Sequence, residues 1–370
     1  MEIATPGLFF TLVSFALALT ILVFIHELGH YAVARLFGVR VEVFSIGFGP
    51  EIIGWTDRKG TRWKIALLPL GGYVRFFGDA DASSSADEDA LEEMTPEERA
   101  VSFHHQSLGR RAAIVAAGPV VNIVFAVVIY AALFVAYGKA IRPPVVEEVQ
   151  PDMPAAEIGL EPGDRILELA GKKVEDAADL VRLVGLYPGM TVDIVFERDG
   201  RRIIKQVTLK RVELTDRFGN HYETGRLGIA LPARPLEVRK LGPLDALVEA
   251  ANETVEMMRL MLTVVGQVIM GVRSLDDLGG PVKIAKASGE QASLGLVPFI
   301  SFLALISVNL GLINLFPIPM LDGGHLFFYA IEAVRGAPLS PRMQEVGYFI
   351  GLALLISLVV LVTWNDLRSL

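Results

Sequence analysis

The feature that most constrains this chain is a long apolar run near its N-terminus, from Ile3 to Ala34. The only Asp, Glu, Lys, Arg or His side chains within it are His26, Glu27 and His30. A helix of this length and composition spans a bilayer. Arg35 is the first basic residue of the chain and marks the membrane interface, about 7 to 14 Å along the helix from the two histidines. The three ionisable groups therefore lie inside the membrane boundary.

His26, Glu27 and His30 form an H-E-x-x-H pattern. Positions i and i+4 share one face of a helix, so both imidazoles can point at a single ion. Imidazole suits zinc, and the adjacent carboxylate can activate a water for attack on a carbonyl. The alternative is two helix histidines with ordinary hydrogen bonds. Ionisable groups inside a membrane are costly and usually functional, which favours the metal site.

Composition narrows the class of protein further. The chain has 370 residues, 52% of them hydrophobic, and a mean hydropathy of +0.47, which indicates a polytopic membrane protein with a soluble part. Cysteine is absent from the sequence, so metal ligands must be nitrogen or oxygen atoms. The net charge of -8 and the lack of a basic run argue against nucleic-acid binding.

Between two apolar runs lies a charged segment with short predicted strands and helices. We predict strands at Val145–Val149 and Arg165–Leu169, a helix at Asp176–Leu186, and a hairpin across Asp199-Gly200. The segment resembles a PDZ domain of the bacterial protease type in Pro154-Ala155-Ala156, Gly159-Leu160 and Pro162-Gly163-Asp164-Arg165-Ile166. Its length suffices for one such domain.

The sequence as a whole predicts a polytopic α-helical membrane protein of four transmembrane helices, with membrane-associated β-hairpins and an inserted α+β PDZ domain. In chain order we predict a first transmembrane helix with H-E-x-x-H (1–37), a membrane-associated β-hairpin region (38–78), an acidic cytoplasmic loop (79–111), a second transmembrane helix (112–138), the PDZ domain (141–211), amphipathic surface helices and a linker (212–290), a third transmembrane segment (291–325) and a fourth transmembrane helix (346–365). In the second helix, Gly118 and Asn122 lie four apart, which predicts close helix packing with one polar contact.

The basic residues indicate how the chain crosses the membrane. Ten Lys and Arg residues lie from Arg35 to Arg111, both included, which places this segment in the cytoplasm and both termini and the PDZ domain outside. The third segment then runs inward. Asp322 at its far end therefore reaches the same membrane side as His26 and His30.

These motifs, in this order, resemble the site-2 proteases, specifically the bacterial regulator-of-sigma-E protease group. The resemblance depends on His26-Glu27-Leu28-Gly29-His30, Gly47-Phe48-Gly49, Pro69-Leu70-Gly71-Gly72-Tyr73, Gly118-Pro119…Asn122 and Asn314…Pro317…Pro319…Leu321-Asp322-Gly323. It implies an intramembrane zinc endopeptidase in the bacterial inner membrane. It also implies that His26, His30 and Asp322 hold Zn²⁺, with Glu27 as general base. Well-studied members of this group carry tandem PDZ domains, whereas this chain has room for one.

The resemblance implies substrate-binding residues as well. Asn314 would contact substrate or steady the reacting carbonyl, although a buried amide that bridges broken-helix carbonyls is the competing interpretation. Gly47, Phe48 and Gly49 would belong to a membrane-associated loop near the site, unless the hairpins are only a cap. For Asp322, the alternative is a residue that merely ends one helix before Gly-Gly.

The implied partners are the lipid bilayer and single-pass membrane proteins, either anti-sigma-factor-like regulators or remnant signal peptides. The PDZ domain would bind a newly exposed substrate C-terminus by strand addition, exclude bulky substrates, or only stabilise the fold. One rival hypothesis is a non-proteolytic membrane PDZ scaffold with a vestigial metal site, against which the intact Glu27 argues. A metal transporter would need ionisable residues in several spans, and the second and fourth offer none.

Overall fold

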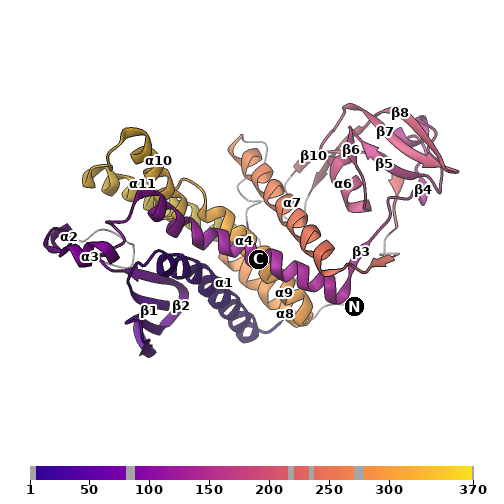
Figure 1. Ribbon diagram of the computed structural model, residues 1–370. Coiled ribbons are helices and arrows are strands. Elements are labelled where there is room, and N and C mark those ends of the chain that lie inside the picture. The colour runs from indigo at the N-terminus through magenta and orange to yellow at the C-terminus, as the bar shows by residue number, and fades with distance from the viewer. Residues whose placement is uncertain (1–5, 81–87, 216–220, 233–236, 271–278, 369–370) are drawn as a thin grey trace. The chain divides into compact units, whose positions relative to one another are not determined.

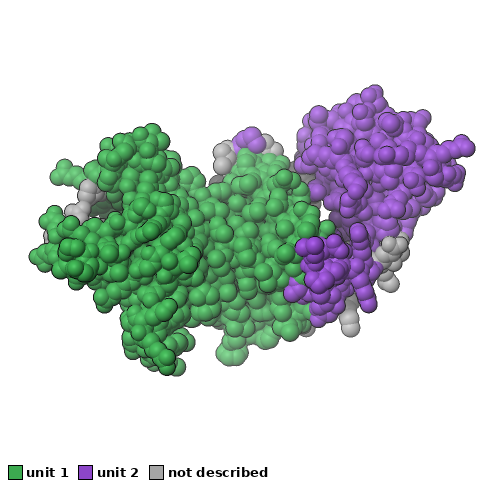
Figure 2. Space-filling view, viewed as in Figure 1, with its two compact units in different colours: residues 1–131, 247–269, 278–370 green, residues 132–246, 270–277 purple. Residues whose placement is uncertain are grey.

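The computed structural model describes residues 6–80, 88–215, 221–232, 237–270 and 279–368. Residues 81–87 of the predicted acidic cytoplasmic loop lie outside the described residues, as do residues 271–278 of the predicted surface-helix region. The chain divides into two compact units (Figures 1 and 2), which are described separately. The first comprises residues 1–131, 247–269 and 278–370, and the second comprises residues 132–246 and 270–277.

Four helices of the described residues are long and apolar enough to cross a membrane, as predicted. They are α1 (Leu8–Leu36), α4 (Leu108–Tyr137), α9 (Leu296–Asn314) and α11 (Pro341–Arg368). Side chains of α1 and α9, including Leu22 and Phe299, form one buried cluster, against which Phe125 of α4 packs. Gly29 brings α1 against α4, because a Cβ atom there would stand 2.5 Å from the Ala117 carbonyl oxygen. These contacts place the histidine-bearing end of α1 beside α4.

The predicted β-hairpin region is one antiparallel hairpin of β1 (Val41–Thr56) and β2 (Arg62–Phe76). Both strands bend, so residues 43–46 pair with 72–75 on one side and with 62–65 on the other. The buried half packs on α1, where Phe44 stacks on Trp63 at 4.3 Å between ring centroids. The outer half exposes large apolar side chains, among them Ile52, Ile53, Trp55 and Leu67. Two short helices, α2 (Glu88–Glu93) and α3 (Pro96–Val101), follow in the loop.

The second unit contains a four-stranded antiparallel sheet with the order β6-β5-β7-β8. Its elements are β3 (Lys139–Ile141), β4 (Glu148–Val149), α5 (Pro154–Glu157), β5 (Arg165–Leu169), β6 (Lys172–Lys173), α6 (Ala177–Gly185), β7 (Thr191–Arg198), β8 (Arg201–Thr208), β9 (Lys210–Thr215), β10 (His221–Arg226), β11 (Ile229–Ala230) and β12 (Glu237–Arg239). We call the elements from β4 to β11 the PDZ-like domain. Its core contains Ile166, Leu180, Ile194 and Phe196.

The structure corrects the prediction of helices and linker for residues 212–290. Strands β9 to β12 occupy its first part, and β11 pairs with β4. Leu227, just before β11, is buried in the domain core, so the domain closes on a segment well beyond residue 211. Among the described residues of this range, the helices are α7 (Pro243–Ile269) and α8 (Pro281–Ser293). The predicted strand at 145–149 is also shorter, with Val145 forming only an isolated bridge to Arg165.

The predicted third segment, 291–325, is not one helix. Helix α9 ends at Asn314, a turn follows, and α10 (Asp322–Arg335) begins as a separate helix. The turn fits tightly against the start of α10, because a Cβ atom on Gly324 would stand 2.6 Å from Pro319 Cα. The turn residue Met320 has a positive φ of 84°. This turn places Asp322 at the first residue of a helix, where the helix dipole favours a carboxylate.

Candidate metal centre

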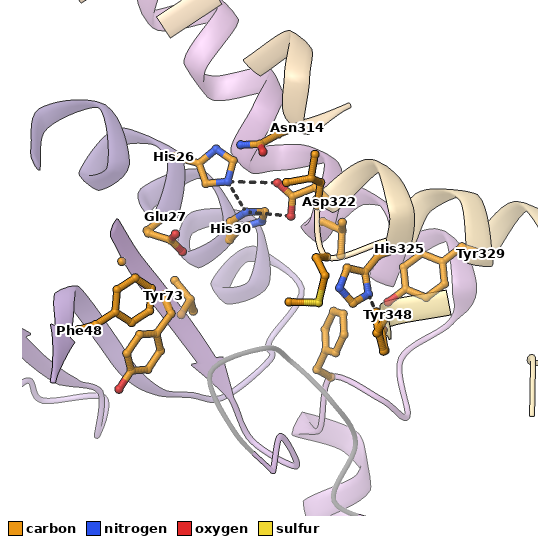
Figure 3. A pocket seen from close by; sticks show the side chains of 16 residues that line it. His26, Glu27, His30, Phe48, Tyr73, Asn314, Asp322, His325, Tyr329 and Tyr348 are labelled. Carbon is orange, nitrogen blue, oxygen red and sulfur yellow. Dashed lines mark hydrogen bonds and ion pairs between the residues drawn. The ribbon is translucent and has the colours of Figure 1, made fainter. Parts of the chain in front are cut away.

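Three side chains that are distant in the sequence converge between α1 and α10 (Figure 3). The Nε2 atoms of His26 and His30 lie 3.2 Å apart. One Asp322 oxygen lies 3.1 Å from His26 Nε2, and the other lies 3.5 Å from His30 Nε2. Among the residues that the structure describes, this is the one group of three or more His, Cys, Asp or Glu side chains that could hold a metal ion.

These separations can be compared with the geometry of a zinc site. Ligand atoms at 2.0–2.1 Å from a tetrahedral ion are about 3.3 Å from one another. The two Nε2 atoms are 3.2 Å apart, and each lies 3.1 or 3.5 Å from a different Asp322 oxygen. With one donor atom taken from each residue, the three atoms lie within 4.8 Å of one another. Two imidazoles and one carboxylate also form a donor set that zinc accepts, with a fourth position left for water. The residues therefore fit a catalytic zinc ion.

Helix α4 orients both imidazoles. His30 Nδ1 lies 2.9 Å from the Ile114 carbonyl oxygen, and His26 Nδ1 lies 3.1 Å from Asn122 Nδ2. The approach of α4 requires Gly118, because a Cβ atom there would stand 2.6 Å from His30 Cε1. Such contacts to the second ring nitrogen direct Nε2 at a metal.

Gly118 and Asn122 therefore do more than the predicted packing with one polar contact. Both lie directly against the histidines of the candidate site. The signal available in the sequence was the Gly-Pro…Asn pattern inside an apolar helix. Without the rotation of α4 about its axis, that pattern could not be connected to His26 or His30.

Glu27 lies between the histidines and the hairpin. Its carboxylate lies near the backbone of Val74 in β2. Strand β2 comes this close because Gly72 has no side chain: a Cβ atom there would stand 3.2 Å from Glu27 Cγ and 2.7 Å from the Ser45 carbonyl oxygen. The hairpin thus holds the candidate general base from the side opposite to α4.

A pocket of about 530 Å³ opens onto these groups. It is lined by His26, Glu27, His30, Phe48, Gly72, Tyr73, Val74, Phe103, Val115, Asn314, Met320, Leu321, Asp322, His325, Tyr329 and Tyr348. Asn314 and Phe48, both predicted to bind substrate, thus face the same cavity (Figure 3).

Gly47 and Gly49 are not among the described residues that line this pocket. Both have a φ of 89° on either side of Phe48, a conformation that glycine adopts without strain. A Cβ atom on Gly47 would also stand 2.7 Å from the Leu68 carbonyl oxygen. Their contribution is to shape the backbone that carries Phe48 into the cavity, where its ring stacks on Tyr73.

His325 and Tyr329 of α10 and Tyr348 of α11 line another part of the pocket. Tyr348 OH lies 3.4 Å from His325 Nδ1, and the Arg111 guanidinium lies over the Tyr329 ring at 4.9 Å. Arg111, on α4, also forms an ion pair with Glu332 at 2.5 Å. The helix that begins with Asp322 is thereby tied to the helix that orients the histidines.

Comparisons with known proteins agree along nearly the whole chain. The model of Peptidase family M50 matches residues 14–358. Proteins of Agrobacterium fabrum and Rhizobium meliloti, both named "Putative zinc metalloprotease", are 46% and 44% identical over 97% and 100% of this chain, and 96% and 100% of theirs. Metalloprotease MmpA of Caulobacter vibrioides is 37% identical over 98% of this chain and 96% of its own.

A solved structure also matches part of the chain. The PDZ domain of the SdrC-like protein from Listeria monocytogenes is 26% identical over 24% of this chain and 84% of that domain, with a TM-score of 0.20.

Proposed function

We propose that this chain, which belongs to peptidase family M50, is an intramembrane zinc endopeptidase. It cleaves transmembrane segments of other membrane proteins. The main support is the convergence of His26, His30 and Asp322, whose donor atoms lie close enough to one another to hold a single metal ion. The adjacent Glu27 supplies the base that a hydrolase of this type needs.

The chemistry follows from the residues around the pocket. A zinc ion held by His26, His30 and Asp322 would polarise the substrate carbonyl and lower the pKa of a water molecule. Glu27 takes the proton from the attacking water and passes it to the leaving amine. Strand β2, which packs against the Glu27 side chain at Gly72 and Val74, keeps the carboxylate oriented for both steps. The Asn314 amide, at the end of α9, donates a hydrogen bond to the substrate backbone beside the reacting bond.

The depth of the site favours a membrane substrate. His26 and His30 lie ten and six residues before the end of α1, which is about 15 and 9 Å along the helix. A substrate helix must unwind before its peptide bonds can be attacked. The exposed apolar half of the hairpin suits a lipid-facing position, and its strand edge can hold an unwound segment by β-augmentation.

We assign the metal site to the cytoplasmic side of the bacterial inner membrane. The basic residues between Arg35 and Arg111 place that segment inside, with both termini and the PDZ-like domain outside. The substrate class is single-pass regulators of the anti-sigma-factor kind, or remnant signal peptides. A PDZ-like domain on the outer side then acts on the outer part of the substrate, as a size filter or as a docking site for a newly exposed C-terminus.

Two variants test this function through their zinc content and their cleavage of membrane proteins. Glu27→Gln removes a base and not a ligand, so it should retain about one zinc per chain and lose cleavage. Asp322→Ala should lose zinc as well. Comparative membrane proteomics of cells with the native chain and with Glu27→Gln should reveal fragments cut within a span only in the native cells. Cleavage by the Glu27→Gln chain above a few per cent of native, or native zinc content in Asp322→Ala, would contradict the proposal.

A further inference from the structure

The Asn122 side chain is fully buried beside the metal centre. Its Nδ2 atom lies 3.1 Å from His26 Nδ1, whereas its Oδ1 atom has no hydrogen-bond partner among the described residues. An unpaired buried oxygen next to an imidazole is costly. The arrangement therefore requires a chemical explanation.

The proton on His26 supplies that explanation. If Asn122 Nδ2 donates to Nδ1, the proton of a neutral imidazole must sit on Nε2, where it blocks metal binding. A half-turn of the amide about its Cβ–Cγ bond exchanges two ends of nearly the same shape. Oδ1 then accepts the N–H of Nδ1, and the Nε2 lone pair faces Asp322 and His30. The unpaired end of the amide is then Nδ2, so metal binding at Nε2 favours this orientation and the number of hydrogen bonds within the chain does not.

His30 shows the same pattern without ambiguity. Its Nδ1 contacts the Ile114 carbonyl oxygen at 2.9 Å, and a carbonyl only accepts, so Nδ1 carries the proton. Nε2 of His30 is then free to bind a metal. An Oδ1 acceptor on Asn122 would give His26 the matching tautomer.

The backbone of Asn122 is fixed independently of its amide. Its carbonyl oxygen accepts a 2.8 Å hydrogen bond from Ser307 Oγ on α9, and Ser307 is also fully buried. Gly311 lets α9 approach α4, since a Cβ atom there would stand 2.8 Å from the Pro119 carbonyl oxygen and 3.0 Å from Ile123 Cγ1. Asn122 therefore holds a constant position relative to His26.

We propose that Asn122 is a positioning residue of the metal centre, whose Oδ1 accepts the Nδ1–H of His26 and so presents Nε2 to zinc. This inference rests on the zinc site of the proposed function. Partners of this kind typically change metal affinity 10- to 100-fold when they are removed.

The test measures the zinc dissociation constant of the purified full chain by competition with a chelator. Asn122→Asp keeps the acceptor and the shape, and should bind zinc within a few-fold of native. Asn122→Leu has a similar size without an acceptor, and should bind about 10- to 100-fold more weakly. The control Thr254→Ala removes a buried hydroxyl whose hydrogen bond runs within α7 to the Ala250 carbonyl oxygen, away from the site, and should bind as native does. Native affinity in Asn122→Leu, or equal losses in Asn122→Asp and Asn122→Leu, would overturn the inference.

A second measurement uses the native chain, so it does not depend on the folding of a variant. With 15N-labelled histidine and zinc bound, His26 Nδ1 should carry a directly bonded proton, and an unprotonated Nδ1 would refute the role of Asn122. Different results would contradict the proposed function and the proposed role of Asn122. A native chain that binds no zinc removes the proposed function, whereas native zinc binding with an indifferent Asn122→Leu removes only the inference about Asn122.

Discussion

Gly118→Ala adds one methyl group to α4 at the point where the helix meets the histidines. The added Cβ would stand 2.6 Å from His30 Cε1 and 2.9 Å from His26 Cε1, and closer still to His30 Nε2. Ordinary van der Waals contact begins at 3.4 Å, so the His30 imidazole must retreat by more than about 0.8 Å and the His26 imidazole by about 0.5 Å. Backbone conformation does not oppose the change, because Gly118 lies inside a helix.

The displacement of the two imidazoles decides how far the zinc affinity falls. Alanine in place of glycine stabilises a helix interior by about 0.8–1.0 kcal/mol, whereas overpacking costs about 1–3 kcal/mol. A metal site tolerates ligand errors of about 0.2 Å, which is less than either shift. We expect zinc affinity to fall on the order of 100-fold, or about 2.8 kcal/mol.

The assay is zinc competition on the purified chain, with Gly109→Ala as the matched control. Gly109 lies in the same helix, and a Cβ atom there would meet nothing within 4 Å. The control should bind zinc as the native chain does. If Gly118→Ala binds zinc as tightly as Gly109→Ala, the imidazoles do not occupy the positions from which this prediction is derived.

Three further predictions concern the rest of the chain. Burial alone would raise the pKa of Asp164, but hydrogen bonds from Arg198 and a backbone N–H outweigh it and lower the pKa. The stabilisation is present above the unfolded pKa of about 3.9 and is lost as pH falls through the folded value. Asp164→Asn should therefore destabilise the PDZ-like domain by about 2–3 kcal/mol at neutral pH, which hydrogen exchange checks, and equal protection in both chains would refute it. In intact cells, a cysteine that replaces Ala100 should be shielded from an impermeant thiol reagent, whereas a cysteine that replaces Lys172 should be labelled. The native chain lacks cysteine and gives no background. Labelling of the Ala100 variant and not of the Lys172 variant would contradict the proposed orientation in the membrane. Replacing residues 142–232 by a flexible bridge should make untrimmed substrates cleavable if the domain is a size filter, whereas loss of trimmed substrates would indicate a docking site.

Much of the fold follows from local sequence. The four apolar runs predict the four long helices because span length depends only on consecutive apolar residues. The strand at Arg165–Leu169 has the predicted bounds, and α6 begins after Asp176, whose side chain caps it. His26 and His30 share a helix face because they are four residues apart. Each of these features is encoded within a few turns of chain.

Other features depend on contacts between distant segments. The sequence could place Asp322 on the same membrane side as the histidines, but only the turn after α9 and the start of α10 set its oxygens 3.1 and 3.5 Å from their Nε2 atoms. The role of Asn122 depends on the rotation of α4, and the closure of the PDZ-like domain depends on the pairing of β11 with β4. Helix rotation and strand pairing are decided by side-chain packing across the whole unit, which no local pattern encodes.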